Sequence, residues 1–68
     1  MDKITLAAAR VNAGLTLEEA AAKIGRAPAT MSAWENEASE PKITDALKLA
    51  ELYGRSVDKI AWKKGDKE

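Results

Sequence analysis

The sequence contains no cysteine and no histidine. The absence of cysteine excludes disulfide bonds and thiolate chemistry, and the absence of both residues excludes the usual zinc sites and histidine acid–base catalysis. The remaining hydroxyl, amine and carboxyl side chains form no recognisable catalytic constellation, and the chain is short for a substrate pocket. We therefore expect a protein that is not an enzyme and that binds no metal and no small-molecule cofactor.

Long apolar runs are also missing. No stretch approaches the roughly 20 apolar residues of a membrane-spanning helix. The N-terminal letters "MDKITL" lack the basic start and the hydrophobic run of a signal peptide. We expect a cytoplasmic protein that has no membrane partner.

Neither sign of charge dominates, because 11 basic residues balance 11 acidic ones. A protein that binds phosphate groups commonly carries a positive surplus, so the net charge gives no support to nucleic-acid binding. The only cationic segment is residues 54–68, with five basic and three acidic residues. Its end, "KKGDKE" at residues 63–68, is predicted to be a charged flexible tail that either keeps the chain soluble or is weakly attracted to DNA.

The 68 residues leave room for one domain, which we place at residues 1–62. A domain of this size buries only about 60% of the surface that its unfolded chain exposes. Much of the apolar material is alanine, which favours helices but adds little buried volume. The larger apolar residues must therefore form a thin core: Ile4, Leu6, Leu15, Ile24, Met31, Trp34, Leu47, Leu49, Leu52 and Ile60.

Glycine and proline divide the chain into short helical segments, and no alternating β-branched run suggests a strand. The first helix is expected at about residues 4–12, before Gly14. A second begins after Thr16, which forms a capping box with Glu19, and ends at Gly25. A third covers about residues 28–36, with Pro28 in the first position. The short connection between the second and third helices predicts a helix-turn-helix corner.

The C-terminal half completes an all-α architecture of five helices. Pro41 lies in a loop, and a fourth helix is expected at about residues 44–53, capped near Thr44 and ended by Gly54. Ser56 is expected to cap a last short turn.

The order of these segments resembles the phage repressor and Cro-type helix-turn-helix domains, also called Xre-like regulators. The matching stretches are "AGLTLEEAA" followed by "IG", then "TMSAWEN", "EPKITDALKLAELYG" and "SVDKI", in the order of the family and nearly with its spacing. The resemblance covers about residues 4–61. It implies a compact five-helix domain that binds double-stranded DNA, with the third helix in the major groove and the second across the phosphate backbone.

The resemblance also implies which residues contact DNA. Base-edge contacts are implied for Ala27, Pro28, Ala29 and Ala33, and backbone contacts for Leu17, Asn36 and Lys42. Alanine and proline cannot form the paired hydrogen bonds that distinguish guanine or adenine. Base reading would then rest on Thr30, Ser32 and contacts with thymine methyl groups. Asn36 either simply ends the third helix or contacts a phosphate group. Lys23 and Arg26 lie near the corner, where either could approach a phosphate group, but we expect them to be solvated surface residues.

Other positions are expected to stabilise the domain. Trp34 shares the inward face of the third helix with Met31, so we expect it to pack in the core rather than to stack on a base. Arg10 and Glu35 occupy positions that tend to form an ion pair in the resembling family. Ile60 and Trp62 lead to two alternatives, because a C-terminal tryptophan either folds back onto the core or contacts a second copy in a homodimer.

Two functions follow from the sequence. The first is a repressor-like transcriptional regulator that binds a two-fold operator as a homodimer. The second is a protein-interaction module that keeps the helix-turn-helix scaffold but uses its small-residue face against another protein. The neutral charge and the "APA" stretch at residues 27–29 favour the second, whereas the resemblance favours the first.

Overall fold

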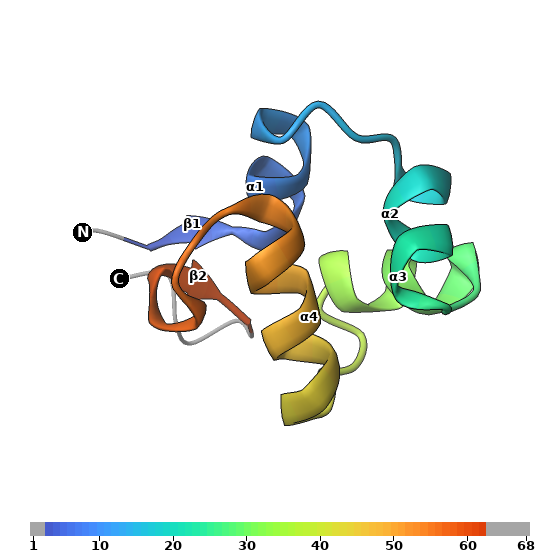
Figure 1. The fold of residues 1–68 in the computed structure, drawn as a ribbon. Helices are drawn as coiled ribbons and strands as arrows, with labels where there is room; N and C mark the ends of the chain where they lie inside the picture. Colours follow the sequence, from blue (N-terminus) through green and yellow to red (C-terminus); the bar gives the residue numbers. More distant parts are fainter. Residues whose placement is uncertain (1–2, 63–68) are drawn as a thin grey trace.

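The computed structural model describes residues 3–62. Over these residues the chain forms four α-helices, a 3-10 helix and two short strands (Figure 1). In chain order they are β1 (Ile4–Thr5), α1 (Leu6–Asn12), α2 (Leu17–Ile24), α3 (Pro28–Glu35), α4 (Ile43–Tyr53), the 3-10 helix η1 (Val57–Lys59) and β2 (Ile60–Ala61). The predicted tail at residues 63–68 lies outside the described residues.

The two strands correct the prediction of an all-α, five-helix domain. β1 pairs with β2 in parallel, with Ile4 opposite Ile60 and Thr5 opposite Ala61. Each strand has only two residues, so neither is long enough to show an alternating pattern in the sequence. Helix α1 accordingly begins at Leu6 rather than Ile4, because the Thr5 hydroxyl accepts a hydrogen bond from the Ala8 N–H at 3.0 Å.

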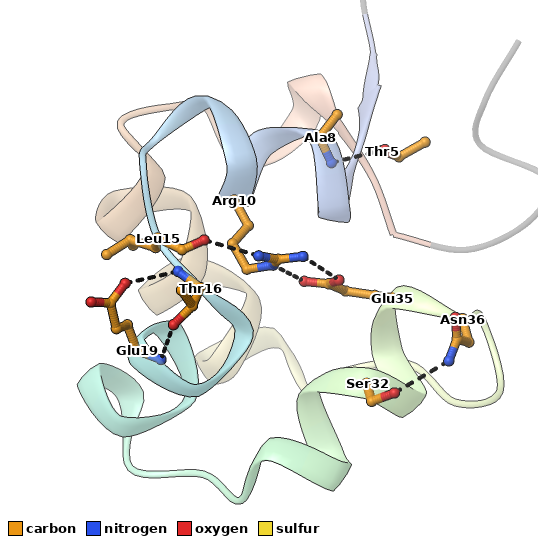
Figure 2. A network of polar contacts seen from close by, with 9 residues as sticks. All are labelled: Thr5, Ala8, Arg10, Leu15, Thr16, Glu19, Ser32, Glu35 and Asn36. Atoms are coloured by element: carbon orange, nitrogen blue, oxygen red, sulfur yellow. Dashed lines mark hydrogen bonds and ion pairs between the residues drawn. The ribbon is translucent and has the colours of Figure 1, made fainter.

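Helix α2 begins and ends where the sequence predicts. The Glu19 N–H donates to the Thr16 hydroxyl at 3.1 Å, and the Thr16 N–H donates to the Glu19 carboxylate at 2.8 Å (Figure 2). These bonds complete the capping box, and the bond from the Thr16 backbone N–H is the main cause that lowers the pKa of Glu19. Gly25 ends the helix in the left-handed conformation, with φ of 75°.

Helix α3 begins at Pro28, as predicted, and Ala27 before it provides no side-chain cap. The helix ends at Glu35, and Asn36 is its C-terminal cap. Glu37 then adopts a left-handed φ of 65°, and the Ala38 N–H donates to the Ala33 carbonyl at 2.9 Å. Glu37 thus occupies the kind of helix-ending position that usually favours glycine.

The last two helical segments differ in detail from the prediction. α4 begins at Ile43, so its cap position is Lys42 rather than Thr44, and no side-chain hydrogen bond caps it. The final turn η1 is a 3-10 helix of three residues, and Ser56 lies at its cap position without a side-chain hydrogen bond. Gly54 ends α4 in the left-handed conformation, as expected.

One apolar cluster joins all four α-helices and β2. The largest fully buried side chains are Met31, Leu49 and Ile60. Leu47 was expected in this core but is 52% exposed, whereas Tyr53, which was not expected there, is buried. The reason is the helical period, since the buried side of α4 consists of positions 45, 46, 49, 50 and 53 and leaves position 47 outside it.

Candidate nucleic-acid interface

The corner between α2 and α3 is the most distinctive local geometry of the fold. The two helices pack directly against each other, and only residues 25–27 connect them (Figure 1). Gly25 turns the chain, and the Arg26 N–H donates to the Ala21 carbonyl at 2.9 Å. Met31 and Trp34 point from α3 into the core, which confirms the packing role predicted for Trp34. The corner is therefore packed directly against the core of the domain.

The residues implied in base contacts lie at the start and along the outer side of α3. Ala27, Pro28 and Ala29 are exposed, whereas Thr30, Ser32 and Ala33 are half-buried. The Ser32 hydroxyl accepts a hydrogen bond from Asn36 Nδ2 at 3.2 Å (Figure 2). This surface presents methyl groups and hydroxyl groups, and it carries no charged side chain between residues 27 and 34.

The residues implied in backbone contacts lie at helix ends. Leu17 is the first residue of α2, and its half-buried side chain packs against the core. Asn36 is the exposed cap of α3, and Lys42 is the exposed cap position of α4. Leu17 can offer a phosphate only its backbone N–H, whereas Asn36 and Lys42 can offer side-chain donors.

Arg10 and Glu35 form the expected ion pair. Arg10 Nε lies 2.7 Å from Glu35 Oε2, and Nη2 lies 3.3 Å from Oε1 (Figure 2). A third donor, Nη1, binds the Leu15 carbonyl at 2.9 Å. The side chains are 17% and 9% exposed, and the hydrogen bond with Glu35 raises the pKa of Arg10. The pair ties the end of α3 to α1 and to the loop before α2.

Tyr53 is a buried polar residue that the sequence did not single out. Its hydroxyl has no hydrogen-bond partner among the described residues. Burial raises the pKa of Tyr53 to about 12, and the negative charge of Glu35 adds to this effect. The phenol is therefore held in its neutral form beside the Arg10–Glu35 pair.

A second ion pair links the corner to α4, and the sequence reasoning missed it. Arg26 Nε donates to Asp45 Oδ1 at 3.2 Å, and Nη2 donates to Oδ2 at 3.0 Å. The Arg26 side chain is 45% exposed, whereas that of Asp45 is only 4% exposed. The expectation that Arg26 is simply solvated is therefore wrong. No local pattern signals this pair, because the two residues belong to different helical segments.

The residues proposed for a homodimer contact fold back onto their own chain. Ile60 is fully buried within the core, so its side chain is not available on the surface. Trp62 is half-buried, and its Nε1 donates to the Val57 carbonyl at 2.7 Å. Of the two residues, only Trp62 presents any surface to a second copy.

Two further features concern ligands and membranes. Residues 3–62 contain no group of three or more acidic side chains arranged to hold a metal ion. Among these same residues, no helix has the length and apolar character required to cross a membrane.

A comparison with known protein families gives a match. The sequence profile of the helix-turn-helix family matches residues 6–60, which include all four α-helices and η1. No curated protein and no solved structure matches the chain.

Proposed function

We propose that this chain, which belongs to the helix-turn-helix family of Cro and phage-repressor type, acts as a repressor-like transcriptional regulator whose helix α3 enters the major groove of DNA. The family is a DNA-binding one and not a family of enzymes. The observation that carries the proposal is the corner of α2 and α3, matched by the family profile and held against α1 by the Arg10–Glu35 pair.

The exposed start of α3 supports this placement. In helix-turn-helix docking, the first residues of the recognition helix approach the base edges while the preceding helix crosses the phosphate backbone. Ala27, Pro28 and Ala29 are exposed at that position, and their small size lets the helix approach the bases closely. Thr30 and Ser32 supply the hydroxyl groups of this face.

Phosphate contacts would come from the helix ends around α3. Lys42 supplies a cation, Asn36 supplies amide donors, and the N-terminus of α2 at Leu17 supplies backbone N–H groups. Few cations are available for this purpose, so few counterions are released on binding. We expect a shallow dependence of affinity on salt concentration.

Base discrimination is expected to be weak. Methyl groups contact only thymine methyl groups, and a hydroxyl does not distinguish one base pair as an amide or guanidinium group does. We expect the preference for operator over random DNA to lie near the lower end of the roughly 10³–10⁷ range of specific binders.

The proposal includes a homodimer on a two-fold operator, since dimers of this class bind two half-sites about one helical turn apart. Its contact at the C-terminal end would use Trp62, because Ile60 is buried in its own chain. The partial exposure of Trp62 supports this choice.

The deciding experiment titrates the protein into a labelled duplex containing the DNA upstream of its own gene, with a random duplex of equal length as control. We expect binding to both at low salt and a preference for the first. If neither duplex is bound at low salt, the DNA-binding function fails, and the alternative of a protein-interaction module takes its place.

A further inference from the structure

We propose that Asp45 lowers the affinity of this domain for DNA by neutralising Arg26, the only charged residue in the connection between α2 and α3. The proposal rests on the DNA-binding function proposed above. It assigns to Asp45, which lies in α4 outside the corner, a role in setting the strength of binding.

The position of Arg26 places its charge near the DNA backbone. It precedes Pro28, the first residue of α3, by two positions, and the first residues of a recognition helix lie at the base edges. Its backbone is held by the hydrogen bond to the Ala21 carbonyl, so the side chain starts from a fixed point. With 45% of its area exposed, the Arg26 side chain is also partly accessible from solvent.

The partner that Arg26 already has is a close mimic of a phosphate. Asp45 accepts hydrogen bonds from Nε and Nη2 with its two separate oxygens, which is the paired geometry that arginine also forms with phosphate. A phosphate would therefore compete for the same donors.

Burial decides this competition in favour of Asp45. Its side chain is only 4% exposed, and separating it from Arg26 would leave a buried carboxylate without a partner, which is strongly unfavourable. We therefore infer that the pair stays closed when DNA binds and that Arg26 adds no net charge to the interface.

A purely structural role for the Arg26–Asp45 pair and the neutralising role proposed here predict opposite changes in DNA affinity when the Asp45 carboxylate is removed. If the pair served only to attach the corner to α4, removing the Asp45 carboxylate would loosen α3 and weaken binding. If Asp45 neutralises Arg26, removing the negative charge frees a cation beside the phosphates and strengthens binding. The two roles therefore differ in the sign of one measurement.

The test measures the affinity of Asp45→Asn for a fluorescein-labelled random-sequence duplex over a series of salt concentrations. The variant keeps the shape of the side chain and loses its charge. We expect severalfold tighter binding at low salt and a plot of log affinity against log salt that is steeper by about 0.9, the value for one additional phosphate contact.

The matched control is the double variant Arg26→Gln/Asp45→Asn, which removes both charges. Its salt slope should return to that of the parent, because the closed pair and the neutral pair carry the same net charge. Asp45→Ser, which is also neutral, serves as a second variant, and circular dichroism establishes that each protein is folded.

Three results would overturn the proposal. The first is a folded Asp45→Asn variant whose slope equals that of the parent or is shallower. The second is a double variant that keeps the steep slope. The third is loss of folding in both single variants, which would make the role of the pair structural. If the parent binds no duplex, the DNA-binding function fails, and the role of Asp45 fails with it. If the parent binds DNA but Asp45→Asn has the same salt slope as the parent, only the role of Asp45 is overturned.

Discussion

The Arg10 guanidinium group donates to both carboxylate oxygens of Glu35, at 2.7 Å from Nε and 3.3 Å from Nη2. Arg10 lies in the last turn of α1, and Glu35 is the last residue of α3. The same guanidinium group also binds the Leu15 carbonyl, immediately before α2 begins. One side chain thus fixes the end of the proposed recognition helix relative to α1 and to the entry of α2, as Figure 2 shows.

Arg10→Met is expected to lower the free energy of unfolding by about 3 kcal/mol, because it leaves the largely buried Glu35 carboxylate without its partner. Urea unfolding followed by circular dichroism measures the change. The double variant Arg10→Met/Glu35→Leu is the control and should recover most of the loss, since neither charge remains. A loss of less than about 0.5 kcal/mol in the single variant would show that the pair behaves as an exposed one.

Tyr53 should make the domain less stable at high pH. Its pKa is about 12 in the folded chain against 10.0 for an ordinary tyrosine, so the folded state retains a proton that the unfolded state loses between these values. The free energy of unfolding should be unaffected below pH 10 and should fall as the pH rises toward 12, by about 1.4 kcal/mol per pH unit at most.

The chain has a single tyrosine, so the absorbance of the phenolate reports on Tyr53 alone. Tyr53→Phe is the control, and it should lack this contribution to the pH dependence. At neutral pH the variant should be at least as stable as the parent, because the missing hydroxyl has no hydrogen-bond partner. Titration of the folded protein with a midpoint near 10 would contradict the effect of burial.

Ala29→Glu should abolish DNA binding without unfolding the protein. Ala29 is exposed in the first turn of α3, where a carboxylate would face the phosphates and bases of the groove. The measurement is the affinity for the upstream duplex at low salt, with helical circular dichroism as the check on folding.

Ser56→Glu is the matched control for Ala29→Glu. It adds the same single negative charge, but at the cap position of η1. Figure 1 shows η1 and α3 on opposite sides of the domain. This variant should bind nearly as well as the parent. Equal affinities of Ala29→Glu and the parent would exclude α3 as the groove-reading helix.

Trp62→Ala should shift the sedimentation of the protein toward the monomer and remove the dependence of Tm on protein concentration, if the chain forms the proposed homodimer. Trp62→Phe keeps an aromatic ring at this position and should preserve more of the association. A parent protein that sediments as a monomer at high micromolar concentration would refute the dimer.

The sequence alone predicts the parts of this protein that depend on neighbours within one helical turn. The capping box of Thr16 and Glu19, the end of α2 at Gly25 and the start of α3 at Pro28 all appear in the structure as expected. Each depends on hydrogen bonds or backbone conformations of residues close together in the chain, so their spacing is sufficient evidence. The sequence therefore determined the helix-turn-helix corner.

The tertiary structure decided every feature that joins distant segments. The pairing of Ile4 with Ile60 and the ion pair of Arg26 with Asp45 have no periodic or local signature. The Arg10–Glu35 pair was expected only through the family resemblance. Whether a side chain such as Arg26 faces solvent or a carboxylate depends on how the helices pack around the shared core, because packing brings together groups that the chain itself keeps far apart.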